Sequence, residues 1–467
     1  MRLITMGENT NRHHKQHEVE HKDDMIDYIS DLPDCILHHI LSFLPTKEVV
    51  KTSILSKRWK TMWVSVPSLD FDDSLLYATE VDLQHSLDST SFMDSVERIL
   101  RLRDGSQIEK FRLSCRVCSH PSRVSSWISN VIMHNVQELY LCIFAEDPFV
   151  IPQSMFDCKS LVILKIELDS LIEIPARVSL PCLKILHLSL VTFPNDDSTE
   201  KLFSSCLVLE ELVLLDCDFL NLKNITISSL TLKRLTIDHV PVSGCNSGSK
   251  IKIDAKNLTH LEYIGTLSNE IFLNSAQSLV KAFIHIPDLY WGQKELACRV
   301  VDLLKWLQNV VFLTVSNHTM KCLVFAGSTL DHFPVFPNLT HLILTMKIGN
   351  NTFGGFMRLL NFCPTLQSID LSDGFESSMR LGENDSIWLS VPICISYHLK
   401  TLTLKNFHAN DSEICFLKCV MKYARVLEKM DVWWCKTEPR DLKKRRDVRL
   451  ELDIIEKGTA TCIIKFL

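Results

Sequence analysis

Two stretches of this chain, LPCLKILHL at residues 180–188 and LEELVLLDC at residues 209–217, carry the same spacing of apolar side chains. The spacing is apolar-x-x-apolar-x-apolar, and it falls on Leu183, Leu186 and Leu188 in the first stretch and on Leu209, Leu212 and Leu214 in the second. It recurs at Leu161/Leu164/Ile166, Leu232/Leu235/Ile237, Leu339/Leu342/Leu344, Leu366/Ile369/Leu371, Leu399/Leu402/Leu404 and Leu427/Met430/Val432. Alternation of this kind predicts short strands that each turn one side toward a core.

The units recur with a regular period. The middle apolar residue of each unit, taken as an anchor, falls at 111, 139, 164, 186, 212, 235, 261, 282, 313, 342, 369, 402 and 430. The eleven steps from 139 to 430 average about 26 residues, within the 20–29-residue range of leucine-rich repeats. A two-sheet sandwich is disfavoured, because it would show turn signals every 8–12 residues. The remaining alternative is a chance rhythm of leucines in an ordinary α/β protein. We predict an α/β solenoid over residues 73–385, with parallel strands on its concave face and helices and irregular returns on its convex face.

The longer steps between anchors predict helices. Between anchors 282 and 313 an apolar stripe at helical spacing consists of Leu296, Val300, Leu303, Leu304 and Leu307. A similar stripe before the first repeat consists of Phe92, Val96, Ile99 and Leu100. We expect this second helix to cover the end of the solenoid, where core would otherwise be exposed.

The residue after each anchor is predicted to face the concave side, because neighbouring residues of a strand point to opposite faces. These residues are Arg112, Tyr140, Lys165, His187, Val213, Thr236, Glu262, Phe283, Thr314, Ile343, Asp370, Thr403 and Asp431; two residues further along lie Leu215, Ile264, His285 and Trp433. The row has an apolar centre and no cluster of arginines, so a phosphate-binding pocket is not indicated. We expect a protein segment to bind at Tyr140, His187, Val213, Leu215, Ile264, Phe283 and Ile343. The alternative is that the chain's own loops cover these residues.

Residues 26–72 have a different pattern. After Pro33, apolar residues recur at helical spacing as far as Leu44, and Pro45 ends the run. Thr46 and Ser56 can each cap a further short helix. The predicted three-helix module is small, and its apolar stripe is richer than such a module can bury alone. An apolar surplus of this kind marks an interaction surface.

This segment resembles the F-box. The resemblance lies in Leu32-Pro33, Leu44-Pro45, Val49-Val50 and the ending Leu55-Ser56-Lys57-Arg58-Trp59. Together with the repeats, Trp127-Ile128 and the two opening stretches, it is similar to plant F-box/leucine-rich-repeat proteins that end in an FBD domain. Residues 386–467, with HLKTLTLKNF and YARVLEKMDV, resemble FBD-like C-terminal repeats. The chain departs from the family pattern at Cys206-Leu207, where Cys-Pro is usual, and in its KKRR and Trp-Trp tail.

The resemblance implies a non-catalytic receptor subunit of an SCF-type (cullin–RING) ubiquitin ligase. The F-box would bind a Skp-family adaptor, and through it a cullin, while the repeats would bind the target protein. The residues expected at the adaptor are Leu32, Pro33, Ile36, Leu37, Ile40, Leu44, Pro45, Val49, Val50, Leu55 and Trp59. Two alternatives stay open: a leucine-rich-repeat binding scaffold with no ligase role, and an enzyme with an unrecognised site.

Catalytic, metal and membrane motifs are absent from the sequence. There is no G-x-S-x-G, no phosphate-cradling glycine loop and no H-E-x-x-H. Cys115, Cys118 and His120 lack the second ligand pair of a zinc finger, so we expect no metal and no cofactor. The net charge of −6 argues against nucleic acid as the main partner.

The compartment is expected to be the cytosol, the nucleus or both. No apolar run is long enough for a membrane span, and residues 1–25 are polar, contain no signal-peptide core and are expected to be disordered. The 17 scattered cysteines are expected to be reduced thiols. The run Lys443-Lys444-Arg445-Arg446 is read as a solvated loop, with a nuclear import signal as the alternative.

Overall fold

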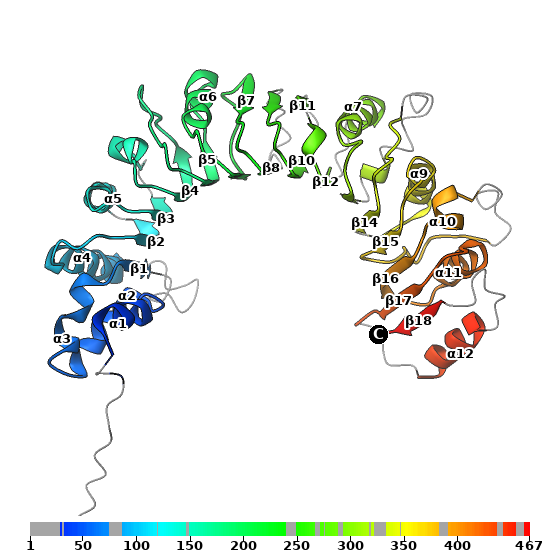
Figure 1. Ribbon diagram of the computed structural model, residues 1–467, viewed down its shortest axis with the longest axis horizontal. Coiled ribbons are helices and arrows are strands. Elements are labelled where there is room, and N and C mark those ends of the chain that lie inside the picture. The colour runs from blue at the N-terminus through cyan, green and yellow to red at the C-terminus, as the bar shows by residue number, and fades with distance from the viewer. Residues whose placement is uncertain are drawn as a thin grey trace, which may run out of the picture.

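The chain forms a horseshoe-shaped arc in the computed structural model, with strands along the inner side and helices along the outer side (Figure 1). The structure describes residues 29, 32–73, 86–118, 120–145, 149–239, 249–266, 271–274, 276–287, 293–316, 319–321, 333–345, 347–382, 391–436, 442–453 and 462–467. The polar tail predicted for residues 1–25 lies outside these residues. The predicted α/β solenoid is confirmed.

The concave face is one parallel sheet of fifteen strands among the described residues. They are β1 (Ser68–Asp72), β2 (Lys110–Cys118), β3 (Glu138–Ala145), β4 (Ile163–Leu171), β5 (Ile185–Thr192), β6 (Glu211–Leu215), β8 (Arg234–His239), β10 (His260–Gly265), β12 (Lys281–His285), β13 (Phe312–Ser316), β14 (His341–Thr345), β15 (Ser368–Leu371), β16 (Thr401–Phe407), β17 (Lys429–Trp434) and β18 (Ile463–Phe466). Each strand pairs with the next of this series.

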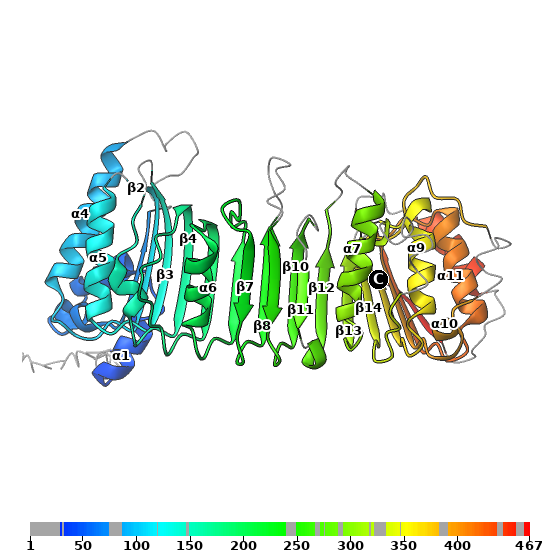
Figure 2. The same cartoon turned by 90° about the horizontal axis from the view of Figure 1, so that it is seen from above.

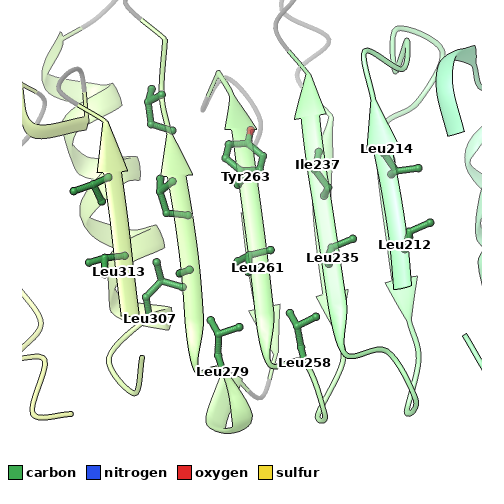
Figure 3. Close-up of a cluster of buried hydrophobic side chains, with 14 of the residues drawn as sticks. Leu212, Leu214, Leu235, Ile237, Leu258, Leu261, Tyr263, Leu279, Leu307 and Leu313 are labelled. Atoms are coloured by element: carbon green, nitrogen blue, oxygen red, sulfur yellow. The ribbon is translucent and has the colours of Figure 1, made fainter. Parts of the chain in front are cut away.

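The anchors of the repeat lie side by side across this sheet. Leu186 pairs with Leu164 on one side and Leu212 on the other, and the same register joins Leu212, Leu235 and Leu261. Every anchor is at most 4% exposed. Figure 3 shows Leu212, Leu235 and Leu261 on neighbouring strands, all turned to the same side of the sheet. One apolar side chain per repeat at a fixed register therefore builds a continuous core.

Helices and short turns cover most of the convex side (Figures 1 and 2). They are α4 (Ser86–Leu102), α5 (Pro121–Met133), η5 (Gln153–Asp157), α6 (Asp196–Ser204), η6 (Ala276–Ser278), α7 (Gln293–Trp306), α9 (Asn350–Asn361), α10 (Ile393–Tyr397), α11 (Asp411–Tyr423) and α12 (Leu442–Asp453). In the middle of the arc, β7 (Asn224–Ser228), β9 (Lys250–Asp254) and β11 (Ile271–Asn274) form a separate three-stranded parallel sheet. The three repeats in the middle of the arc thus close with a strand where most of the other repeats close with a helix.

Both apolar stripes predicted as helices are helical. In α7, Val300, Leu303 and Leu304 are buried against the sheet. In α4, Val96 is buried, while Ile99 packs partly buried against the same core. The helical period alone was enough to place these elements.

The role predicted for α4 is wrong. A first strand, β1, precedes α4 and pairs with β2 in parallel, so α4 is the crossover between two strands and not a cap over the end. Residues 68–72 fall within residues 26–72, the segment predicted as the helical module, although Val66, Leu69 and Phe71 carry the apolar spacing of the later repeats. The sheet's N-terminal edge is bounded instead by the helical module, described below.

The C-terminal region continues the same sheet through β16, β17 and β18. The basic run predicted as a loop lies in the helix α12. There the Arg445 guanidinium lies 4.7 Å from the Trp434 ring centroid, and the Lys444 ammonium donates to the His408 carbonyl at 2.7 Å. The loop prediction was therefore wrong, because contacts with the last repeat order this segment as a helix. Trp433 is exposed and Trp434 packs against the core.

Two further searches of the described residues concern metals and membranes. Within the ranges given above, no group of three or more His, Cys, Asp or Glu side chains could hold a metal ion. Cys115 is buried in β2. No helix in the described part of the chain has the length and apolar character needed to cross a membrane.

Candidate protein-interaction surfaces

The N-terminal helical module has a small core of its own. Its elements are α1 (Asp34–Leu41), α2 (Thr46–Lys51), η1 (Thr52–Ile54), α3 (Trp59–Met62) and η2 (Trp63–Ser65). The core consists of Leu37, Leu41, Val49, Trp59, Met62 and Val66, with Leu32 and Trp63 packed against it. Three residues expected at the adaptor, Leu37, Val49 and Trp59, are therefore at most 6% exposed. They support the module from within and present almost no surface to a partner.

The outer surface of the module is rich in exposed apolar side chains. Ile36 and Ile40 are 44% and 42% exposed, and their four-residue separation places them on one face of α1. The neighbouring segments add Phe43, Leu44, Ile54 and Leu55, exposed by 74%, 39%, 86% and 64%. Pro33 and Pro45 are also exposed, and Val50 is half-buried. We call Ile36, Ile40, Phe43, Leu44, Ile54 and Leu55 the apolar module surface.

Phe43 and Ile54 were not predicted as surface residues. Phe43 lies outside the helical stripe, in the turn that follows α1, and Ile54 lies at the end of η1. Only the packing of the helices determines which side of these turns is exposed.

Arg58 connects the end of the module to its beginning. Its guanidinium donates a 2.6 Å hydrogen bond to the Leu32 carbonyl and pairs with the Asp34 carboxylate. The hydrogen bond from Arg58 lowers the pKa of Asp34. The position of α1 is thus set by the residue that directly precedes Trp59.

The module is also bonded directly to the solenoid. The Thr46 hydroxyl, which had been predicted as a helix cap, accepts a 2.7 Å hydrogen bond from the Asp70 backbone N–H of β1. Arg103, beyond α4, donates to the Val66 carbonyl at 2.7 Å. The Pro67 carbonyl accepts from the backbone N–H groups of Glu109 and Lys110. These bonds bracket the chain between the module and the first repeat, so the two parts form one continuous body.

On the concave face, the residues after the anchors form one row across the sheet. The strand register joins Arg112 to Tyr140, Tyr140 to Lys165 and Lys165 to His187. It continues through Val213, Thr236, Glu262, Phe283, Thr314, Ile343, Asp370, Thr403 and Asp431. The predicted alignment of these thirteen residues is confirmed.

A hollow of about 340 Å³ opens on the concave face over the first six strands. We call it the concave hollow. It is lined by Asp72, Arg112, Leu113, Ser114, Tyr140, Leu141, Cys142, Lys165, Ile166, Glu167, His187, Ser189 and Leu215. Long side chains line it one position after the anchors, and two positions further on the lining includes the short side chains of Ser114, Cys142 and Ser189. Ser114 pairs with Cys142 in this second row, and Glu167 pairs with Ser189.

Ion pairs fix several walls of the hollow. Arg112 donates to Asp70 at 2.9 Å and to Asp72 at 3.3 Å. Burial would lower the pKa of Arg112, but these two carboxylates outweigh burial and raise it. His187 contacts the Glu211 carboxylate at 2.7 Å. Burial nevertheless lowers the pKa of His187, so the imidazole is neutral at pH 7.

Tyr140 lies between two lysines at the floor of the hollow. The Lys110 and Lys165 ammonium nitrogens are 5.2 Å and 5.5 Å from its ring centroid, both within cation–π range. Its hydroxyl donates to Glu138 at 3.1 Å. Burial, and next the charge of Glu138, raises the pKa of Tyr140 to about 12. The ring is therefore a neutral aromatic platform at all physiological pH values.

The residues predicted to bind a target fall into two places. Tyr140, His187 and Leu215 line the hollow, and Val213 lies next to His187 in the register. Ile264, Phe283 and Ile343 lie further along the arc on β10, β12 and β14. The sequence did not single out Ser114, Lys165, Glu167 or Ser189 as binding residues. Aligning the residues three positions after each anchor would have shown the short side chains that create the hollow.

Comparison with known families gives two matches. A model of the F-box domain matches residues 29–71. A model described as the At1g61320/AtMIF1 LRR domain matches residues 99–463. The first match covers the apolar module surface, and the second covers the strands from β2 to β17.

Several Arabidopsis thaliana proteins are similar over most of their length. The F-box/LRR-repeat protein At4g14096 is 32% identical over 94% of this chain and 95% of its own. The F-box/LRR-repeat protein At4g14103 is 34% identical over 73% of this chain and 91% of its own. The putative F-box/FBD/LRR-repeat protein At3g59240 is 34% identical over 73% of this chain and 68% of its own.

Proposed function

This chain belongs to the plant F-box/leucine-rich-repeat family, and from that premise we propose that it is the substrate-recognition subunit of an SCF-type cullin–RING ubiquitin ligase. Its F-box would bind a Skp-family adaptor and, through the adaptor, a cullin. Its repeats would bind the target protein. The architecture is typical of adaptor proteins that have no catalytic site of their own.

The apolar module surface is the observation that carries this proposal. Six large apolar side chains are exposed within residues 36–55, directly beside a core that is already filled. Leaving such a surface in water is costly at about 25 cal/mol per Å², and soluble monomers rarely do so without a partner. Helices docked into a groove of an adaptor would bury it.

The proposed mechanism is catalysis by positioning. A receptor that holds a target lysine near a ubiquitin-charged enzyme converts a bimolecular encounter into a nearly unimolecular one. The gain depends on geometry, because tethering fails when the two ends cannot engage together. The hydrogen bonds from the Asp70 N–H to Thr46 and from Arg103 to Val66 support this mechanism, since they fix the docking module relative to the arc.

The rival function is a leucine-rich-repeat scaffold with no ligase role. Co-purification of the full chain with a Skp-family adaptor separates the two. We expect the wild type to retain the adaptor. Leu32→Ala/Pro33→Ala, at the start of the motif, and Ile40→Glu/Phe43→Glu, on the exposed surface, should each lose it.

The matched control is Leu230→Glu, a charge placed on an equally exposed apolar residue of the solenoid. It should retain the adaptor as the wild type does. Failure of the wild type to retain any Skp-family adaptor would overturn the ligase function and leave the scaffold.

Three finer assignments belong to the same proposal. We propose that residues 386–467 are FBD-like repeats, as the name of one relative suggests for that relative. The site of action would be the cytosol, the nucleus or both, and neither nucleic acid nor a membrane would be a main partner. The mildly acidic net charge supports the exclusion of nucleic acid.

A further inference from the structure

The concave hollow contains charges that the chain itself does not neutralise. Arg112 is matched by Asp70 and Asp72. Lys165, in contrast, forms no ion pair with any described residue, and its ammonium lies 5.5 Å from the Tyr140 ring centroid. Glu167, two residues away on β4, likewise has no ion-pair partner within the described ranges. One cation and one anion of the lining are therefore available to a ligand.

Two hydroxyl groups of the lining are also available. Ser114 is 5% exposed, and its hydroxyl has no hydrogen-bond partner among the residues that the structure describes. The Ser189 hydroxyl, on the other side of Glu167 in the register, is in the same situation. Neither oxygen is one of the fully buried polar atoms without a partner in the described part of the chain, so both hydroxyls are accessible from the hollow that they line. Each can therefore donate a hydrogen bond to water or to a ligand there.

We infer that the concave hollow binds the carboxylate side chain of an acidic residue in an extended segment of the target protein. Lys165 supplies the counter-charge, Ser189 on the neighbouring strand β5 donates a hydrogen bond to the carboxylate, and Glu167 accepts a backbone N–H of the segment. This inference rests on the proposed function, because it names the class of target that the receptor would hold.

The spacing of Lys165 and Glu167 suits an extended peptide. Two residues along a strand are separated by about 6.6 Å, the same separation that an extended segment has between alternate residues. A segment lying along β4 can therefore meet both charges at once. Tyr140 and Leu215 provide apolar contact on either side of them.

The charge balance favours a carboxylate over a phosphate. A phosphoryl group carries close to two negative charges at pH 7, and phosphate-reading sites use several unpaired guanidinium groups. Here Arg112 is already paired with two carboxylates, His187 is bonded to Glu211, and Asp72 and Glu167 add negative charge to the lining. A single unpaired ammonium matches a single negative charge.

The test uses pools of heptapeptides, acetylated and amidated at their ends, whose central residue is fixed as Glu, Gln or phosphoserine. Each pool is passed over the immobilised full-length chain, and retained peptide is measured by mass spectrometry. We expect the Glu pool to be retained at least about tenfold more than the Gln pool, as one charge-assisted contact provides. Lys165→Met, which keeps the apolar stem, should reduce retention of the Glu pool to the Gln level.

Lys281→Met is the matched control. Lys281 lies on the same concave face with its ammonium 5.3 Å from the Phe312 centroid, but outside the hollow, and its loss should leave the preference for Glu intact. Equal retention of the Glu and Gln pools, a preference insensitive to Lys165, or stronger retention of the phosphoserine pool would each overturn the inference.

Adaptor co-purification from the same preparations keeps the two proposals distinguishable. If the adaptor is retained without a preference for Glu, only the inference about the hollow fails. If the preference persists while no adaptor binds, the ligase function fails and the hollow remains a binding site of a scaffold.

Discussion

The apolar module surface and the concave hollow are built in opposite ways. The first comes from one segment of 20 residues, Ile36 to Leu55, which exposes six large apolar side chains. The second is assembled from six strands that lie about one repeat apart in the sequence, and its exposed side chains are mostly polar. A contiguous apolar surface suits one constant partner. A surface to which each repeat contributes about two side chains can change its binding specificity by substitutions in one strand at a time. The difference also predicts how mutations in each region should act.

The largest expected effect is the loss of the module's core. Trp59 is 6% exposed and packs in the core of the module, so Trp59→Ala should cost about 3–5 kcal/mol of stability. We expect adaptor co-purification to be lost while peptide retention by the hollow continues, which would show that the two surfaces fail independently. Thermal unfolding and both binding assays are measured on the same variant.

Trp306→Ala is the control for that substitution. Trp306 is 38% exposed at the end of α7, and its removal should leave both binding activities unchanged. Loss of peptide retention in Trp59→Ala would contradict the comparison, because the two surfaces would then share one folding unit.

A second large effect is expected in the solenoid core. Leu212 is fully buried in the anchor row and lies on the strand that supplies Leu215 to the hollow. Leu212→Ala should cost about 2–5 kcal/mol and weaken peptide retention, with adaptor binding preserved. The adjacent Val213→Ala, on the concave side, should change the midpoint of thermal unfolding much less. Equal shifts for the two variants would contradict the inward and outward alternation on which the hollow depends.

The repeat arc could be predicted from the sequence because one physical rule, an apolar residue at a fixed register, acts in every repeat. The positions of α7 and α4 and the concave row followed from periods of 3.6 and 2. The strand β1 was missed although Val66, Leu69 and Phe71 carry the spacing of the repeat, because they lie within the segment that resembles the F-box. Its place in the sheet is fixed by pairing with β2 and by the bond from Asp70 to Thr46, neither of which is a sequence pattern.

The two surfaces could be predicted only in part, because tertiary packing does not appear as a sequence pattern. The resemblance gave the F-box segment, yet it assigned Leu37, Val49 and Trp59 to the partner when packing assigns them to the core. The apolar centre expected on the concave face drew attention to Phe283 and Ile343, while the hollow lies among polar residues near β4. The side chains of Ser114, Cys142 and Ser189 in the lining of the hollow are short. A search of the sequence for apolar residues does not detect short side chains.

A third, intermediate effect concerns the bond between the two regions. Thr46→Val removes the hydroxyl that accepts from the Asp70 backbone N–H and leaves that N–H unpaired, at an expected cost of about 1–3 kcal/mol. Hydrogen exchange at the Asp70 amide should become faster, and the exchange rates of other amides in the sheet should change less. Thr52→Val is the control, since the Thr52 hydroxyl bonds to the Val49 carbonyl within the module. If Thr52→Val accelerated exchange at Asp70 as much as Thr46→Val does, the hydrogen bond between Thr46 and Asp70 would not be what joins the two regions.

The smallest expected effect is a pH dependence of the arc. Burial lowers the pKa of His187, His239, His260, His285 and His341, all on strands of the solenoid. A histidine with a lowered folded-state pKa binds its proton less readily when folded than when unfolded. The solenoid should therefore be most stable above the ordinary histidine pKa of about 6.5 and lose stability as the pH falls below it.

Thermal unfolding measured between pH 7.5 and pH 5 checks this expectation. The melting temperature should fall with pH, and His341→Gln should flatten part of the slope, because its ring stacks on Phe312 at 4.4 Å with burial as the cause of its lowered pKa. If the melting temperature rose on acidification, the neutral imidazoles would not be the stabilising form. The histidines of the concave face would then become protonated without a loss of stability. Among the described residues, Lys165 would no longer be the only unpaired positive charge that determines which anion the hollow binds.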